Sequence, residues 1–231
     1  MSLLQEFLDS PVVCLRQFCK LPATEKSELK TGTIPISSKD WQTALTGFET
    51  NYDVHESGLY CFWWLGKQAD LENGFATHWL KGKVIGGDAG RIHPDLQELR
   101  GGYVMHKITW QFPRRVKPGG VPLYIGKGSS VFKRVKLHLQ WPKSAWPKYS
   151  KPPQVSEIQR AGSVNSQTQF RKPFEYLFQT VTDDVVRTQL LLANVGLSFI
   201  NRPFYDVAAR FFGEDELIGA LRPPFNLDSE R

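Results

Sequence analysis

The residues of this 231-residue chain best suited to chemistry lie between Val121 and Leu139, in the stretch VPLYIGKGSSVFKRVKLHL. An apolar run ends there in Gly126-Lys127-Gly128, and a basic segment with helical spacing follows. Glycine lets a backbone approach a phosphate closely, and Lys and Arg neutralise phosphate charge. The stretch therefore predicts contact with phosphate, either in a bound nucleotide or in the backbone of a nucleic acid.

The two common nucleotide-binding patterns do not fit this stretch. A P-loop has Ser or Thr after its Gly-Lys pair to bind Mg²⁺, and this chain has Gly128 there. The dinucleotide fingerprint has a third glycine that allows close helix packing, and this chain has Val131 there. Nucleotide hydrolysis is therefore the weaker alternative, and a nucleic-acid phosphate is favoured.

The distribution of charge favours the same partner. The formal net charge is +6, but the window from Leu99 to Ser156 holds twelve basic residues and no acidic one, which leaves 17 basic and 23 acidic residues elsewhere. A basic block on an acidic remainder is typical of a surface that binds a polyanion, although a solvated basic face without a partner is the alternative. The twelve are Arg100, Lys107, Arg114, Arg115, Lys117, Lys127, Lys133, Arg134, Lys136, Lys143, Lys148 and Lys151.

Motifs spread over the chain resemble those of the GIY-YIG nuclease family. The two tripeptides are Gly58-Leu59-Tyr60 and Tyr124-Ile125-Gly126. Arg134 lies ten residues after Tyr124, and His138 follows one helical turn later. Near the end, the frame E-x-x-L-I-x-x-x-x-P-x-[FY]-N from Glu214 to Asn226 is similar to that in the incision domain of bacterial excision-repair nucleases. Each motif alone is weak, but together and in order they make a specific pattern.

The chain departs from the family pattern in two respects, one of which is that the span from Phe174 to Glu214 is expected to hold more helix than a minimal core needs. Its two motif tyrosines are 64 residues apart, whereas family cores usually join them by a short hairpin. We therefore expect a nuclease domain at 51–231, with an insertion at about 66–120 that contributes to target recognition, preceded by a helical extension at 1–50.

The resemblance implies roles for two charged residues. Glu214 would hold one Mg²⁺ ion, with Mn²⁺ able to substitute, because Mg²⁺ favours carboxylate oxygens. The alternative for Glu214 is an acid in the first turn of a helix. Arg134 would hold the scissile phosphate through its planar guanidinium. The alternative for Arg134 is a solvent-exposed basic side chain without a specific role, like others in the basic window.

The remaining matched residues would assist the reaction. Tyr60 and Tyr124 would lie on adjacent strands near the attacking water, but core tyrosines would look the same in sequence. The ordinary pKa of a phenol is about 10, so a tyrosine acting as base needs a nearby cation such as Lys127. His138 could polarise a tyrosine, act as a base or bind phosphate. Asn226 would support the site through side-chain hydrogen bonds.

The function implied is a Mg²⁺-dependent endonuclease that hydrolyses phosphodiester bonds of double-stranded DNA. We favour a sequence-specific restriction enzyme, and a homodimer is possible because one such site cuts one strand. The alternatives are a repair or mobile-element nuclease and an inactive nucleic-acid-binding protein of the same fold.

The resemblance implies an α+β fold with a small antiparallel sheet of about three strands flanked by helices. Apolar and β-forming runs predict strands at 58–65, 79–85, 103–112, 121–125 and 174–181, with a turn starting at Gly126. Helical spacing and caps predict helices in 3–20 with a break at Pro11, from Ser38 through Phe48, at 129–140, from Thr182 or Asp183 to Val195, and from Asp206 to Leu221. Residues 141–153 are Pro- and Lys-rich and predict a loop.

Nothing in the sequence indicates a membrane or an oxidising compartment. The start lacks a signal-peptide pattern and no apolar run is long enough to span a bilayer, so we expect a cytoplasmic protein. Cys14, Cys19 and Cys61 match no zinc pattern and are expected to be reduced, packed thiols.

Overall fold

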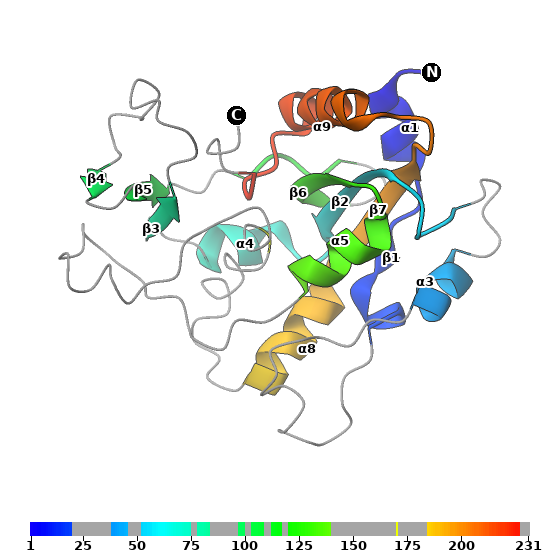
Figure 1. Cartoon of the computed structure of the whole chain (residues 1–231). Coiled ribbons are helices and arrows are strands. Elements are labelled where there is room, and N and C mark those ends of the chain that lie inside the picture. Colours follow the sequence, from blue (N-terminus) through cyan, green and yellow to red (C-terminus); the bar gives the residue numbers. More distant parts are fainter. Residues whose placement is uncertain are drawn as a thin grey trace.

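The computed structural model describes residues 1–19, 38–45, 52–74, 78–83, 97–99, 103–108, 112–116, 120–139, 170 and 184–226 (Figure 1). Its centre is an antiparallel sheet of four strands in the order β1-β7-β2-β6. These strands are β1 (Val13–Cys14), β2 (Gly58–Trp64), β6 (Val121–Gly128) and β7 (Val195–Asn201).

Helices cover both faces of this sheet. On one face lie α3 (Ser38–Ala44), α5 (Val131–His138) and α8 (Asp184–Asn194), and on the other lie α1 (Leu3–Asp9) and α9 (Val207–Leu221). The strand β2 is buried at all seven positions, which explains why its sequence, GLYCFWW, is an uninterrupted apolar run rather than an alternating one.

Alternation along β2 divides the core into two clusters. Tyr60, Phe62 and Trp64 pack on the face of α5 and α8, whereas Leu59, Cys61 and Trp63 pack on the face of α1 and α9. The pairing of β2 with β6 has one irregularity, between Phe62 and Trp63, where the register shifts by one residue. The predicted site residues divide between these two faces.

The chain between β2 and β6 forms further elements, although these two strands are neighbours in the sheet. It contains α4 (Gln68–Gly74) and a second antiparallel sheet of three strands in the order β3-β5-β4. These strands are β3 (His78–Lys83), β4 (Gln97–Leu99) and β5 (Tyr103–Ile108).

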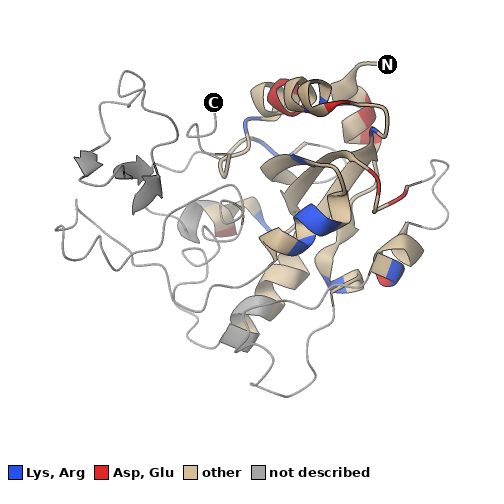
Figure 2. Ribbon diagram, in the orientation of Figure 1, with Lys and Arg blue, Asp and Glu red and all other residues tan. Residues whose placement is uncertain are grey.

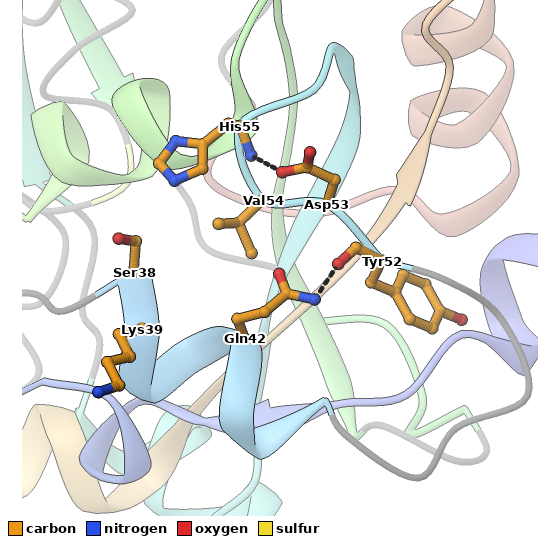
Figure 3. A pocket seen from close by; sticks show the side chains of 7 residues that line it. All are labelled: Ser38, Lys39, Gln42, Tyr52, Asp53, Val54 and His55. Carbon is orange, nitrogen blue, oxygen red and sulfur yellow. Dashed lines mark hydrogen bonds between the residues drawn. The ribbon is translucent and has the colours of Figure 1, made fainter.

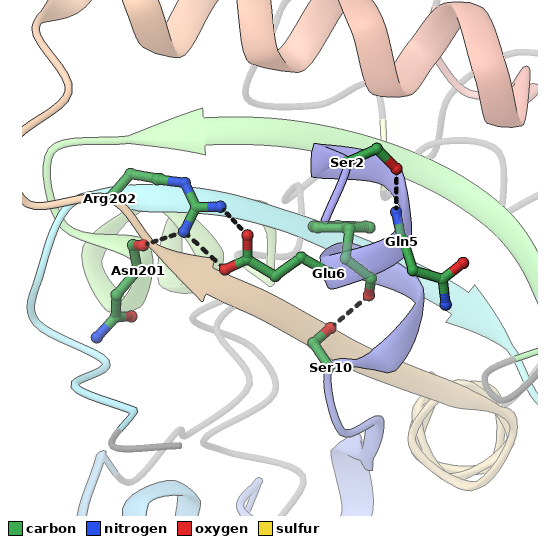
Figure 4. A network of polar contacts seen from close by, with 7 residues as sticks. Ser2, Gln5, Glu6, Ser10, Asn201 and Arg202 are labelled. Carbon is green, nitrogen blue, oxygen red and sulfur yellow. Dashed lines mark hydrogen bonds and ion pairs between the residues drawn. The ribbon is translucent and has the colours of Figure 1, made fainter. Parts of the chain in front are cut away.

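The N-terminal residues belong to the same core. The 3₁₀ helix η1 (Leu15–Gln17) follows β1, and β1 pairs with β7. The guanidinium of Arg202, directly after β7, donates two hydrogen bonds to the carboxylate of Glu6 on α1, and Figure 4 shows this pair with its neighbours. This ion pair raises the pKa of Arg202 and joins α1 to the end of β7.

The α+β class with an antiparallel sheet and flanking helices is confirmed, and the sheet has four strands rather than about three. β2, β3, β5, α3, α5, α8 and α9 occur near their predicted positions. Three predictions were wrong. The strand β7 was missed, and the turn expected to start at Gly126 is instead a continuation of β6 to Gly128. After Pro11, where a second short helix was expected, the chain forms the strand β1 and only then the short 3₁₀ helix η1.

Some predictions fall outside the described residues. They are the strand at 174–181, the loop at 141–153, the caps Thr182 and Asp183, and Phe48. Within the described part of the chain, no helix combines the length and the apolar character that crossing a membrane requires. The three cysteines are free thiols.

Candidate active site

Three of the predicted site residues form a buried aromatic cluster on the α5 face of the sheet. Tyr60 comes from β2, Tyr124 from β6 and His138 from the last turn of α5. The Tyr60 hydroxyl oxygen and His138 Nε2 are 2.7 Å apart and share a hydrogen bond. The ring centroid of Tyr124 lies 6.3 Å from that of Tyr60 and 4.8 Å from that of His138. The sequence thus correctly predicted that the two tyrosines lie side by side on adjacent strands.

The glycine of the second tripeptide makes room for this cluster. Gly126 is directly opposite Tyr60 in the pairing of β2 with β6. A Cβ atom at Gly126 would lie 2.4 Å from the Tyr60 hydroxyl oxygen and 3.0 Å from a ring carbon of Tyr124. Any other residue at this position would therefore displace both tyrosines. The pattern Tyr-Ile-Gly is a packing requirement as well as a sequence motif.

The Tyr60 hydroxyl is held in its neutral form. Burial raises its pKa well above the ordinary value, and the nearby Tyr124 raises it further. The guanidinium of Arg134, on α5, lowers this pKa through its charge and a hydrogen bond, while the charge of Glu214 raises it. The exposed fractions of Tyr60 and Tyr124 are 0% and 1%, so the phenols expected to adjoin a water are enclosed in this structure.

Lys127 and Glu214 form an ion pair on the opposite face of the sheet. Lys127 extends from β6 toward α9, where its ammonium contacts a carboxylate oxygen of Glu214. The same ammonium lies 4.2 Å from the ring centroid of Phe211, a cation–π contact. The Glu214 side chain is only 10% exposed, whereas its neighbour Glu216 is exposed.

The position of Glu214 excludes the alternative role considered for it. The helix α9 begins at Val207 with Asp206 as its N-cap, so Glu214 lies in the middle of the helix rather than in its first turn. A carboxylate at that position does not gain from the N-terminal end of the helix dipole, because that effect fades within the first turn. Its partner is Lys127.

Asn226 attaches the C-terminal segment to the open edge of the sheet. Its side-chain oxygen accepts a hydrogen bond of 2.8 Å from the Ile125 amide, and its side-chain nitrogen donates one of 2.7 Å to the Ile125 carbonyl. The amide of Phe225 donates a further bond of 2.9 Å to the Leu123 carbonyl. Asn226 and Phe225 therefore supply hydrogen-bond partners for backbone groups at the open edge of β6, as a neighbouring strand would. The side-chain hydrogen bonds predicted for Asn226 are present, and they tether the C-terminal segment to the strand that carries Tyr124 and Lys127.

The seven predicted residues thus form two groups that flank β6. Tyr60, Tyr124, Arg134 and His138 lie on the α5 face, Lys127 and Glu214 lie on the α9 face, and Asn226 holds the edge between them. The two groups interact electrostatically, since the charge of Glu214 reaches the Tyr60 phenol. Because β6 is an edge strand, both groups adjoin one edge of the sheet.

The donor set for a metal ion is a single carboxylate. Among the described residues, no three His, Cys, Asp or Glu side chains are grouped so that they could hold a metal ion. Mg²⁺ is commonly held by one or two carboxylates, with water and substrate phosphate supplying the other ligands, so Glu214 fits such an ion. The ammonium of Lys127 contacts that carboxylate and would compete with the ion.

Three of the basic side chains that the structure describes come from α5, the helix that also carries His138. α5 carries Lys133, Arg134 and Lys136 and no acidic residue, and Figure 2 shows these as a blue band across the helix. Lys133 and Lys136 are exposed, and Arg134 is partly buried. The side chains of Arg100, Lys107, Lys117, Lys143, Lys148 and Lys151 lie outside the described part of the chain.

A pocket of about 420 Å³ lies on the α5 side of the sheet but contains none of the predicted site residues. It is lined by Ser38, Lys39, Gln42, Tyr52, Asp53, Val54 and His55, and Figure 3 shows the amide of Gln42 bonded to the Tyr52 carbonyl at one side. The ring of His55 packs edge-on against Phe132 of α5 at 5.3 Å. The pocket therefore adjoins the helix that carries Arg134 without opening onto the tyrosines.

Sequence reasoning missed two aromatic residues at the site. Phe211 lies three residues before Glu214 on α9, so helical periodicity alone could have placed it on the same face. Phe170 stacks on Phe62 with ring centroids 3.6 Å apart and lies 6.2 Å from His138, closing over the tyrosine cluster. No spacing or motif in the sequence indicated this second contact.

No family model matches the chain, and comparison with curated proteins and with solved structures gives no significant match.

Proposed function

We propose that this protein is a metal-dependent DNA endonuclease of the GIY-YIG type. The observation that carries the proposal is the gathering of seven residues, chosen from three distant parts of the sequence by their motif spacing, around one edge strand. Two pairs of their side chains are in direct contact, Tyr60 with His138 and Lys127 with Glu214, and the side chain of Asn226 bonds to the backbone of Ile125, between Tyr124 and Lys127. Such convergence is the usual sign of a site rather than of chance tripeptides.

The arrangement supports a division of roles in phosphodiester hydrolysis. Arg134 and the exposed lysines of α5, Lys133 and Lys136, would bind and orient the phosphate backbone. The Arg134 guanidinium would neutralise negative charge on the scissile phosphate. Glu214 would hold Mg²⁺, which supplies charge neutralisation for the phosphoryl and leaving oxygens when bound. Lys127 would leave Glu214 as the ion binds and become available to the phosphate or to a tyrosine.

The Tyr60–His138 contact supports a proton relay. A neutral phenol is a poor base, but it can accept a proton from water while it passes its own proton to a neighbour. The nearest such neighbour is His138 Nε2, at 2.7 Å. Because Tyr60 is fully buried, this step requires DNA binding to open a path for water to the hydroxyl. Tyr124, whose ring adjoins that of His138, is the alternative base.

Within this class we propose a sequence-specific, restriction-type enzyme. The chain between the adjacent strands β2 and β6 forms a second sheet, which provides surface for target recognition inside the catalytic unit. Palindromic targets would then be cut by two copies of the chain, one for each strand. A repair or mobile-element nuclease would use the same chemistry on a different target.

One observation favours a second candidate, a protein that binds nucleic acid without cutting it. The complete burial of Tyr60 and its raised pKa suit a structural tyrosine equally well. This candidate keeps the basic face of α5 and gives the ion pair of Lys127 and Glu214 a purely structural role.

Cleavage of supercoiled plasmid DNA with and without Mg²⁺ tests the proposal. Wild-type protein should nick or linearise the plasmid only with the metal ion, and Glu214→Gln should bind DNA but not cut it. Glu216→Gln, an exposed change on the same helix, is the matched control and should cut normally. Binding without any cleavage by the wild type would favour the second candidate, and full cleavage by Glu214→Gln would exclude Glu214 as the metal ligand.

A further inference from the structure

A surface pocket of about 420 Å³ between α3 and the segment that leads into β2 has no part in the proposed reaction. Its volume lies within the range of roughly 300–1,000 Å³ that is typical of sites for small ligands. We call it the α3 pocket, and it is lined by Ser38, Lys39, Gln42, Tyr52, Asp53, Val54 and His55.

Hydrogen bonds hold the two sides of the α3 pocket in place. The side-chain amide of Gln42 donates to the Tyr52 carbonyl, which joins α3 to the opposite side of the pocket. The Val54 carbonyl in turn accepts a hydrogen bond of 2.7 Å from the Phe132 amide at the start of α5. The pocket is therefore formed by contacts within the protein itself, as is usual for a binding site that exists before its ligand arrives.

Polar groups and one apolar side chain face each other across the α3 pocket. Figure 3 shows Ser38 and Gln42, both from α3, on one side and the Val54 side chain and the His55 ring on the other. The Ser38 hydroxyl and the His55 imidazole can each donate or accept a hydrogen bond, and the amide oxygen of Gln42 accepts one. The pocket thus offers both donors and acceptors beside an apolar surface.

The charges at the α3 pocket are balanced. Lys39 and Asp53 both line it, and the Asp53 carboxylate accepts a hydrogen bond of 2.8 Å from the His55 amide. One positive and one negative side chain do not select a bare anion or a metal ion. A neutral ring with donors and acceptors on its edge fits this lining better, and a nucleobase is such a ring. Ser and Gln side chains bond to base edges, and bases held outside a duplex pack against apolar and aromatic side chains.

The α3 pocket adjoins the basic helix α5 on the same face of the sheet. The His55 ring packs edge-on against Phe132 of α5, with centroids 5.3 Å apart. The exposed Lys136 lies one helical turn after Phe132 and therefore on the same side of α5. Arg134 lies about 200° around the helix from Phe132, across a diameter of roughly 10–12 Å. Because a DNA strand rises ~3.4 Å per nucleotide, a strand held at Arg134 would reach the pocket about three to four nucleotides away.

We propose that the α3 pocket binds a single nucleotide with an unstacked base, which in DNA would lie about three to four nucleotides from the scissile phosphate. The proposal rests on the proposed nuclease function and names a further contact with its substrate. A base in an intact duplex is stacked and paired, so it can enter a pocket only after it leaves the helix. A free mononucleotide carries the same base, sugar and phosphate and is the other source of this ligand.

The first arm of the test uses full-length protein without divalent metal and a short duplex that contains a cleavage position mapped on plasmid DNA. The fluorescent base 2-aminopurine, whose emission rises when it unstacks, replaces single bases about two to five nucleotides from the scissile phosphate. Wild-type protein should raise the emission at one of these positions. Ser38→Trp, which places a ring in the pocket, should abolish that rise and weaken binding by roughly 5- to 100-fold, as expected for the loss of one base contact.

Thr43→Trp is the matched control, because it adds the same ring at an exposed position of α3 that does not line the pocket. It should bind DNA and raise the emission as the wild type does. His55→Leu keeps an apolar side chain next to Phe132 but removes the imidazole, so it should also lower the emission and serves as the probe if Ser38→Trp does not fold. A rise that persists in both pocket variants, or that Thr43→Trp loses as well, overturns the inference.

The second arm is titration calorimetry with the four deoxynucleoside monophosphates. Binding by the wild type and Thr43→Trp but not by Ser38→Trp, without an emission change in the duplex, would identify the free nucleotide as the ligand. Absence of pocket-dependent binding in both arms overturns the inference, even if the protein cuts DNA. A wild-type protein that does not cut DNA overturns the proposed nuclease function, and calorimetry then decides the inference alone.

Discussion

Lys127 and Glu214, which are 87 residues apart in the chain, form an ion pair that joins the edge strand β6 to the middle of α9. The exposed fraction of the carboxylate side chain is 10% and that of the lysine side chain is 26%, so neither charge is well solvated. The attraction of the Lys127 ammonium offsets the desolvation free energy that burying the Glu214 carboxylate costs. In this structure the proposed metal ligand is thus held in place by a cation from the chain itself.

Replacing Lys127 by Met should therefore destabilise the protein and change its response to Mg²⁺. The free energy of unfolding at neutral pH should fall by about 1–3 kcal/mol, because the Glu214 carboxylate loses its charged partner. Added Mg²⁺ should raise the melting temperature of Lys127→Met more than that of the wild type, since no ammonium competes for the carboxylate. Calorimetry with and without Mg²⁺ measures both effects, and Lys133→Met, an exposed change on α5, is the control. An equal Mg²⁺ response in wild type and variant would contradict the competition.

Gly126→Ala should be strongly destabilising, because its Cβ would lie 2.4 Å from the Tyr60 hydroxyl oxygen. Displacing a packed ring in a core costs about 1–3 kcal/mol. Gly219→Ala is the matched control, because no atom lies within 4 Å of the new methyl group in α9. That variant should gain about 0.5–1 kcal/mol from the better helix propensity of alanine. Urea unfolding measures both, and a similar effect of the two substitutions would rule out the close contact at Gly126.

Changes at Asn226 should loosen the edge of β6. Asn226→Ala removes both hydrogen bonds to Ile125, and Asn226→Asp keeps an acceptor for the Ile125 amide but sets a carboxylate oxygen against the Ile125 carbonyl. Each variant should lose about 1–2 kcal/mol of stability. Hydrogen exchange at the Ile125 amide should quicken more in Asn226→Ala than in Asn226→Asp. Unchanged protection in Asn226→Ala would mean that the side chain does not hold the strand.

The stability of the fold should decrease at alkaline pH through Tyr60. Burial raises the pKa of this phenol above its ordinary value of about 10, so the unfolded chain releases the proton at a lower pH than the folded protein does. The stabilising contribution is therefore complete below about pH 10 and is lost as the pH rises further. Absorbance of tyrosinate followed alongside circular dichroism should show Tyr60 ionising only as the protein unfolds. Tyr60→Phe should lose less stability over the same pH range, and an equal loss would assign the effect to other groups.

Local patterns in the sequence predicted much of the fold. The apolar run at Gly58–Trp64 predicted β2, and the spacing of Val131, Val135 and Leu139 predicted α5, because these signals depend on periods that secondary structure imposes. The strand β7 was missed because Gly196 and Ser198 interrupt its apolar pattern and because it follows α8 directly. Its position between β1 and β2 depends on long-range pairing, which no local pattern encodes.

The candidate site shows the same division between local pattern and long-range packing. Motif spacing alone selected Tyr60, Tyr124, Arg134, His138 and Glu214, because chemistry requires particular side chains at particular points on strands and helices. Only the tertiary structure decided that two of these residues share a hydrogen bond in a buried cluster and that Glu214 faces Lys127 across the other side of the sheet. Side-chain alternation along β6 separates Gly126 from Lys127 onto opposite faces, and the packing of α5 and α9 then determines which partner each face receives.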